Sequence, residues 1–355
     1  MMRLATLALV LLPVSASAGV YSTAEPTPFA AQPDGTAEEL SFKPDKSGRF
    51  KQELTKYELL LNPEKKSPER DAVLARLKTQ QTPADHAADL IRLGKLDEAL
   101  NVLEPHTRER VPDFRVLANL AHVYAARGDW SDAVIKHHSA WLDSEFPGDL
   151  PGTSPAQLKW LQRVEKDFYP HWLKAHQEQV AHKVPAESED VLPLFGMKFV
   201  NDAGQYEPGK VAAAERAKLP PDAIAITQQL LLWSPTDTQL VWLLAELYAA
   251  DGRFRESDIL FDDCVRSRYY SNRKILMAHR DAVRRVVATL PAVADDPVLI
   301  SSPVEKPKKV ATLEDLGLSE NSLIAFGVVF GGFAVALIGL QIRSVRRRAR
   351  LRARR

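Results

Sequence analysis

The residues of this chain best suited to metal chemistry are its histidines. Five of the nine lie in one region of the sequence, namely His137, His138, His171, His176 and His182. On a helix, side chains three or four positions apart lie on the same face. The first two of these histidines are adjacent and the other three are spaced by five and six residues. The spacing therefore does not predict a metal site within one helix, and we expect no bound metal.

The candidate nucleophile and acid–base groups lie in one short segment, Asp262, Asp263 and Cys264. Cys264 is the only cysteine, which excludes an internal disulfide, and its place is more typical of core packing than of a catalytic thiol. We expect the two aspartates to be solvated. The sequence contains no glycine-rich phosphate loop, HExxH, Gly-x-Ser-x-Gly or paired CxxC motif. We therefore expect a protein that is not an enzyme and has no cofactor.

The charges of the chain are unevenly distributed. The 47 basic residues nearly balance the 46 acidic residues, for a formal net charge of +1. Without Arg3 and the eight arginines from Arg343 onward, 38 basic residues remain against 46 acidic ones, so the body carries −8. An acidic body excludes a broad nucleic-acid-binding surface, and we expect no nucleic-acid partner.

Residues 1–18 have the features of a secretory signal peptide. Arg3 precedes an apolar run of 11 residues, and small residues follow up to Ala18. Such a run is too short for a helix to cross roughly 30 Å of hydrocarbon. We expect cleavage after Ala18, so that the mature chain begins at Gly19.

Residues 322–342 are expected to form a single transmembrane helix, because 323–342 contain no charged residue. The arginine-rich tail, 343–355, should stay in the cytoplasm. This orientation places the body outside the cytoplasm, on the periplasmic side of a bacterial membrane. Gly327 and Gly331 form a GxxxG pair, which suits a homodimer of spans and is also common in single spans.

Between these ends, the sequence predicts a helical domain at 48–290, preceded by a flexible proline-rich leader at 19–47 and followed by a flexible linker at 291–321. Flanking helices are expected at 48–61, 68–80 and 271–289, where they would cover the open ends of the domain. An insert at 148–203 should contain a helix at 154–182. Residues 195–209 are the one candidate β-hairpin, with its turn at 201–204.

One turn pattern occurs three times in the helical domain. A glycine is followed two residues later by a large apolar residue, four later by an acid and five later by a small residue. The glycines are Gly94, Gly128 and Gly252, and the small residues are Ala99, Ala133 and Ser257. Gly94 and Gly128 are 34 residues apart. The pattern extends to residues that we expect at helix crossings: Ala121, Tyr124, Ala140, Ala223, Ala245, Tyr248 and Cys264.

This pattern resembles the tetratricopeptide repeat (TPR), with units at 80–113, 114–147, 204–237 and 238–271. The resemblance implies an all-α fold, a right-handed α-α superhelix of antiparallel helix pairs whose small residues allow close crossings. Two units depart from the pattern. The unit at 80–113 has His86 and Leu90 where Leu and Tyr are usual, and the unit at 204–237 lacks the turn glycine.

The resemblance also implies a concave groove lined by the first helix of each unit. Carried over to this chain, the ligand-contacting positions are Arg92, Arg115, His122, Trp242 and Glu246. Alanines lie between them, and these would let a partner segment approach the backbone. The alternative for each of these five residues is an ordinary solvated side chain.

We therefore expect a membrane-anchored extracytoplasmic TPR protein that binds a protein or peptide partner in this groove, as a scaffold or assembly factor. Two alternatives remain open. The insert at 148–203 is an enzyme or metal-binding domain for which the repeats act as substrate adaptor, or the body is a structural spacer.

Overall fold

The computed structural model describes residues 21–23, 49–182, 191–268, 270 and 272–291. All regular secondary structure in these residues is helical, which confirms the expected all-α class. None of the helices in the described part is long and apolar enough to cross a membrane. The predicted signal peptide, transmembrane helix and arginine-rich tail, and all but three residues of the leader, lie outside the described residues, as does the linker after Pro291.

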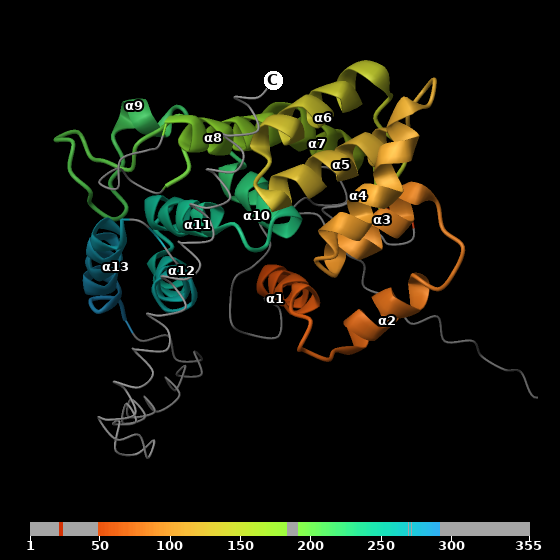
Figure 1. Cartoon of the computed structure of the whole chain (residues 1–355). Helices are drawn as coiled ribbons and strands as arrows, with labels where there is room; N and C mark the ends of the chain where they lie inside the picture. The colour runs from red at the N-terminus through yellow and green to blue at the C-terminus, as the bar shows by residue number, and fades with distance from the viewer. Residues whose placement is uncertain (1–20, 24–48, 183–190, 269, 271, 292–355) are drawn as a thin grey trace, which may run out of the picture. The chain divides into compact units, whose positions relative to one another are not determined.

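Two helical hairpins form the N-terminal part of the domain (Figure 1). The helices are α3 (Pro83–Arg92), α4 (Leu96–Leu103), α5 (Phe114–Arg127) and α6 (Trp130–Asp143), with a short 3₁₀ helix, η1 (Glu104–Arg108), after α4. Helix α5 packs against α3, α4 and α6, so the two hairpins stack directly on each other.

The C-terminal part is a series of four helices, each packed on the next. They are α10 (Ala223–Trp233), α11 (Thr238–Ala250), α12 (Phe254–Ser267) and α13 (Arg273–Val287). Asp237 begins α11 because its carboxylate accepts hydrogen bonds from the N–H groups of Gln239 and Leu240.

The three predicted glycine turns have the same backbone geometry. Gly94, Gly128 and Gly252 have φ of 71°, 80° and 79°, the left-handed region that favours glycine. In each turn the glycine N–H donates to the carbonyl three residues earlier, at 2.9–3.1 Å. The next N–H donates to the carbonyl five residues earlier, at 2.8–2.9 Å. This pair of bonds ends the first helix and reverses the chain, so the prediction of three equivalent turns is confirmed.

The expected unit at 204–237 does not form a helical pair. Only a single turn, α9 (Ala213–Arg216), precedes α10. The sequence explains why the first helix of this unit is missing, because Pro208 and Gly209 come before this turn and Pro220 and Pro221 follow it. Proline lacks the N–H that a helix interior requires, so a full first helix cannot form between these positions.

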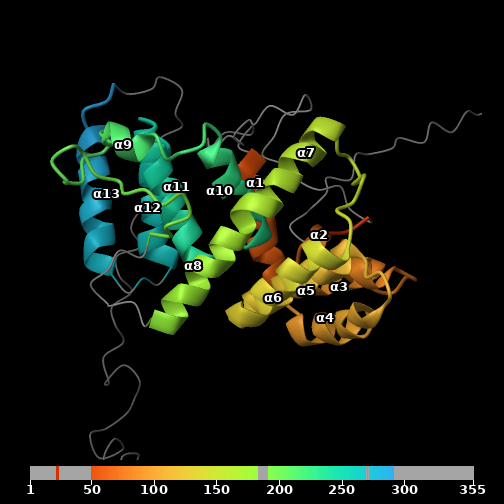
Figure 2. The ribbon, with the colours of Figure 1, turned by 90° about the horizontal axis from the view of Figure 1, so that it is seen from above.

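The insert forms a long helical segment, and the predicted helix at 154–182 is confirmed. It consists of α7 (Pro155–Arg163), a π-helical turn η2 (Val164–Phe168) and α8 (Tyr169–His182). In Figure 2 this segment runs between α6 on one side and α10 and α11 on the other. Its side chains bond to the C-terminal helices, with Trp160 Nε1 donating to Asp222 at 2.8 Å and Trp172 Nε1 to Asp237 at 2.7 Å.

The predicted β-hairpin at 195–209 is wrong, although its turn is present. Gly204 has φ of 73° and donates to the carbonyl of Asn201 at 2.9 Å. The Asn201 side chain also accepts from the N–H groups of Ala203 and Gln205, both at 3.0 Å. Because these side-chain bonds use the amides at the turn, the segment remains an irregular loop, and the structure describes no strand there.

The first two helices are α1 (Arg49–Leu61) and α2 (Pro68–Arg76), close to the expected ranges. Helix α1 packs on both α3 and α10, and so lies between the N-terminal hairpins and the C-terminal helices. Its Glu58 also forms a salt bridge of 2.6 Å with Arg268, just after α12. The expectation that the flanking helices cover open ends is therefore wrong for α1, because one face of α1 is buried between the N-terminal hairpins and the C-terminal helices.

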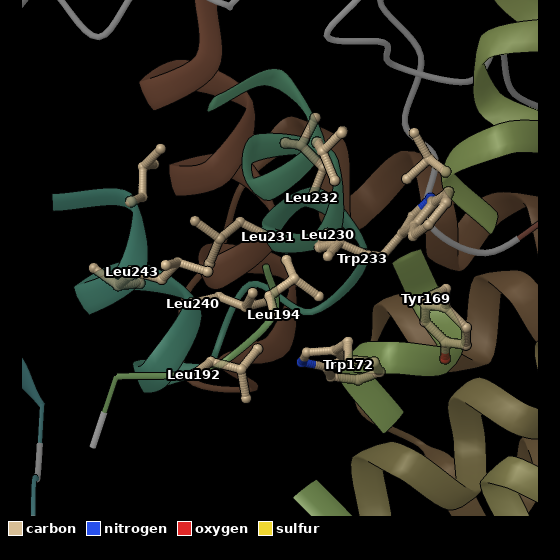
Figure 3. Close-up of a cluster of buried hydrophobic side chains, with 14 of the residues drawn as sticks. Tyr169, Trp172, Leu192, Leu194, Leu230, Leu231, Leu232, Trp233, Leu240 and Leu243 are labelled. Carbon is tan, nitrogen blue, oxygen red and sulfur yellow. The ribbon is translucent and has the colours of Figure 1, made fainter. Parts of the chain in front are cut away.

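A large apolar core joins the insert to the C-terminal helices (Figure 3). Tyr169 of α8 contacts both Trp233 of α10 and Trp172 of its own helix, with ring centroids 5.7 and 5.1 Å apart. Leu192 and Leu194 add side chains from the segment after the insert helix. The insert is thus part of the same core as the helices that follow it.

Candidate peptide-binding cleft

The small residues of the repeat pattern lie buried in the helical pairs. Buried completely are Ala99, Ala121, Ala133, Ala140, Ala245, Tyr248, Ser257 and Cys264, and Ala223 is 5% exposed. The Ser257 hydroxyl of α12 donates to the Ala245 carbonyl of α11 at 2.8 Å, which shows directly how closely these two helices approach. Tyr124 is half-buried, and its hydroxyl donates to Glu104 at 3.3 Å.

Cys264 has the environment of a packing residue. Burial raises the pKa of its thiol to about 12, and the Tyr270 hydroxyl lies 3.0 Å from the sulfur. A thiol with such a pKa carries almost no thiolate at neutral pH and is a poor nucleophile.

Two of the five predicted groove residues cannot contact a partner in this structure. Trp242 and Glu246 of α11 are both fully buried. The Glu246 carboxylate accepts from Trp242 Nε1 at 2.8 Å and lies 2.6 Å from His279 Nδ1 of α13, whose ring stacks on Tyr206 at 3.5 Å. Helix α13 and the loop containing Tyr206 therefore cover this face of α11. The prediction that Trp242 and Glu246 line an open groove is wrong.

Of the other three predicted groove residues, two lie in one cleft and the third lies outside it. Arg92 of α3 and His122 of α5 both line an open cleft of about 650 Å³. Arg115, the second residue of α5, instead forms a salt bridge of 2.6 Å with Asp113, the residue that begins this helix. Arg115 is not part of the cleft lining.

The cleft lies where four parts of the domain meet. Part of its lining comes from the first helices of the two hairpins and includes Arg92, His122 and the exposed Ala126. Tyr57 of α1 closes one side, and the turn before α11, up to Gln239, closes the other.

Another part of the cleft lining, the aromatic wall, is formed by tryptophan side chains. Trp130 stacks on His176 with ring centroids 4.3 Å apart and contacts Trp172 edge-on at 5.6 Å. Trp233 also lines the cleft. His176 and Trp172 are held by the Asp237 carboxylate, at 2.8 and 2.7 Å. Burial alone would raise the pKa of Asp237, but its bonds to His176, Leu240 and Trp172 keep that pKa below its usual value.

Two nitrogen atoms in the cleft lack hydrogen-bond partners among the described residues. They are Nη2 of Arg92 and Nε2 of His122, and both side chains are more than nine-tenths buried. The Arg92 guanidinium packs over the Tyr57 ring at 4.4 Å, which orients it without using its N–H groups. Both atoms have almost no solvent-accessible surface, and buried polar groups are rarely left unpaired in native proteins.

Burial lowers the pKa of His122 to about 4, so its imidazole is neutral at pH 7. The Tyr169 hydroxyl lies 2.9 Å from His122 Nδ1. Since the hydroxyl has no other acceptor among the described residues, it donates to Nδ1, and the ring proton is on Nε2. His122 therefore carries a neutral N–H donor, covered from solvent in this structure, beside the permanent positive charge of Arg92.

The sequence analysis missed the residues of the aromatic wall. Trp130, Trp172 and Trp233 could be recognised as large apolar residues, but their meeting place depends on how the insert packs. Asp237 could be recognised as a helix-starting residue, because it precedes an apolar run. No spacing rule connects Asp237 with Trp172, 65 positions earlier.

The described part of the chain contains no group of three or more His, Cys, Asp or Glu side chains placed to hold a metal ion. No protein-family model, no curated protein and no solved structure matches this chain.

Proposed function

We propose that this chain is a membrane-anchored extracytoplasmic protein of the tetratricopeptide type that binds a segment of a partner protein, as a scaffold or assembly factor. The repeat assignment is supported by three equivalent glycine turns and by buried small residues at the helix crossings. Anchoring and orientation are supported by the sequence alone, through the signal peptide, the apolar stretch at 322–342 and the basic tail.

The observation that carries the binding proposal is the pair of unpartnered donors in the cleft. An apolar cleft with a few convergent polar groups is the usual form of a binding site. Arg92 Nη2 and His122 Nε2 are covered in this structure, and they would pair with a backbone carbonyl or an acidic side chain of the partner once the side chains over them move. Trp130, Trp172 and Trp233 would contact apolar side chains of the partner. The cleft thus suits a segment that combines apolar and acidic residues.

Site-specific photocrosslinking in native membranes tests this proposal. A photoreactive amino acid replaces Ala126, which is exposed in the cleft, and in a matched variant it replaces Ala214, which is exposed on α9 outside the cleft. We expect one partner to be captured at position 126 and at least tenfold less of it at position 214, as measured by mass spectrometry. Capture of the same proteins at both positions would contradict a role for the cleft.

Blocking the cleft provides a second test of the same proposal. Ala126→Trp places a large ring in the cleft, and it should reduce co-purification of the captured partner at least tenfold. Because position 126 is exposed, the folded domain should tolerate this change, and circular dichroism checks that it does. Ala214→Trp is the control and should leave co-purification unchanged.

A further inference from the structure

A second peptide-like contact lies on the same hairpins, apart from the cleft. Residues 21–23 lie against α3 and α5, and Asn119 of α5 bonds both backbone groups of Tyr21. Its Oδ1 accepts from the Tyr21 N–H at 2.8 Å, and its Nδ2 donates to the Tyr21 carbonyl at 3.0 Å and to the Ala84 carbonyl at 3.1 Å. Asn119 is fully buried, so its amide group is positioned to bind an extended backbone.

Asp85 of α3 binds the next two residues of the segment. Its carboxylate accepts from the Ser22 hydroxyl at 3.1 Å and from the Thr23 N–H and hydroxyl at 2.5 and 2.8 Å. The Thr82 hydroxyl adds a fourth bond at 2.6 Å. Burial alone would raise the pKa of Asp85, but the bonds from Thr82, Thr23 and Ser22 hold that pKa below its usual value. The segment therefore supplies three of the four donors that this carboxylate uses.

The Tyr21 side chain fills an aromatic pocket. Its ring is 3% exposed and makes edge contacts with Phe114 at 5.6 Å and with Phe146 at 6.1 Å. Burial, and then the nearby Glu165 carboxylate, raise the pKa of the Tyr21 hydroxyl well above its usual value. The hydroxyl therefore remains protonated, and a tyrosine at this position combines a large buried ring with a polar end close to Glu165.

We propose that α3 and α5 form a second peptide-binding site, specific for an extended Tyr-Ser-Thr segment, and that the chain's own residues 21–23 occupy it as a displaceable ligand. Without a bound segment, Asn119 Oδ1 and most of the Asp85 carboxylate would lose the donors that they have here, which is costly for buried polar groups. Attachment through residues 24–48 gives the segment a high effective concentration near the site. None of Asn119, Asp85, Phe114 and Phe146 lines the cleft, so this inference does not rest on the proposed function.

The wild-type full-length chain tests the proposal without any mutation. With isotope-labelled protein, hydrogen exchange should show the amides of Tyr21 and Thr23 protected. An excess of the unlabelled peptide GVYSTAE, residues 19–25, should speed the exchange of the chain's own amides at least tenfold. The peptide GVASTAE, which lacks the tyrosine ring, should have no effect. Unprotected amides, or protection that the peptide does not change, would overturn the proposal.

Affinity measurements with full-length variants identify the residues that bind. Labelled GVYSTAE should bind the Tyr21→Ala variant at least tenfold more tightly than the wild type, because the self-ligand no longer competes. Adding Asn119→Ala should abolish this binding, whereas Asn101→Ala, at an exposed position on α4, should not change it. Equal binding with and without Asn119 would overturn the proposal. A wild-type dimer that the peptide dissociates would overturn the assignment of the ligand to the same chain.

Discussion

Ala245 and Ser257 set the distance between two packed helices. Ala245 is fully buried in α11, and its carbonyl accepts a hydrogen bond of 2.8 Å from Ser257 of α12. A bond from one helix's side chain to the other helix's backbone requires that both residues at the crossing be small. The same requirement explains why Ala121 and Ala133 are fully buried in α5 and α6.

Ala245→Leu should lower the free energy of unfolding by about 1–3 kcal/mol, because the larger side chain overpacks the α11–α12 crossing. Denaturant unfolding of the protein measures this loss of stability. Ala181→Leu, at an exposed position of α8, is the control and should change stability by about 0.5 kcal/mol or less. Equal stability of both variants would contradict the close crossing.

His122 should make the domain sensitive to acid. Its pKa in the folded state is about 4, below the ordinary value of 6.5, because burial favours the neutral ring. A group with a lowered folded pKa binds more protons in the unfolded state. Its contribution to stability is therefore present above pH 6.5 and is lost as the pH falls from 6.5 toward 4, up to about 3 kcal/mol.

Unfolding measured at several pH values between 4 and 7.5 tests this dependence. His122→Gln should flatten the fall in stability below pH 6.5, since glutamine does not take up a proton. His138→Gln, which changes an exposed histidine on α6, should leave the pH dependence as in the wild type. If the free energy of unfolding falls with pH in the same way for the wild type and for His122→Gln, His122 is not the group that causes the acid sensitivity.

At the scale of elements, α1 connects parts of the domain that are distant in sequence. It packs on α3 and α10, and its Glu58 pairs with Arg268. Phe50 and Leu60 of α1 are buried, whereas Leu59 is 37% exposed. The helix therefore contributes to the core through one face only.

Leu60→Ala should lower the free energy of unfolding by about 2–5 kcal/mol, because it leaves a cavity between α1 and its neighbours. Leu59→Ala changes the adjacent residue in the same helix, and its effect should be about 0.5 kcal/mol or less. Chemical denaturation of the two variants makes the comparison. Similar losses in both would indicate that α1 is only loosely packed.

At the scale of the whole molecule, the charged residues divide the chain into an acidic body and a basic tail. The body is acidic, at −8, and the basic residues of the tail follow directly after the apolar stretch at 322–342. Basic clusters resist translocation across a membrane, so this order is the physical basis of the proposed orientation.

Protease added to spheroplasts of a Gram-negative host should degrade the helical body and leave a small C-terminal fragment that carries the tail. Epitope tags placed before residue 48 and after residue 355 follow the two parts. Deletion of 322–342 should release the body into the periplasmic fraction. A body that resists protease until the membrane is solubilised would contradict the orientation.

Much of the fold could be predicted from local sequence. Ser67 and Ser154 begin helices where expected, because their side chains accept bonds from N–H groups at the start of the helix. The turn glycines and the small residues near them also follow local rules. The predicted unit at 204–237 does not form a helical pair, because its prolines prevent a full first helix. These prolines are visible in the sequence, but the prediction relied on the 34-residue spacing.

What the sequence determined by itself is the set of helices and turns and the residues that must be small, since these depend on backbone conformation and neighbouring positions. Only the tertiary structure decided which side chains line the cleft and which are buried. Helix α13 and Tyr206 buried Trp242 and Glu246, the insert brought Trp172 and His176 to the cleft beside Trp130, and residues 21–23 came to lie on α5. These outcomes depend on contacts between residues tens of positions apart, which neither repeat spacing nor helix periodicity specifies.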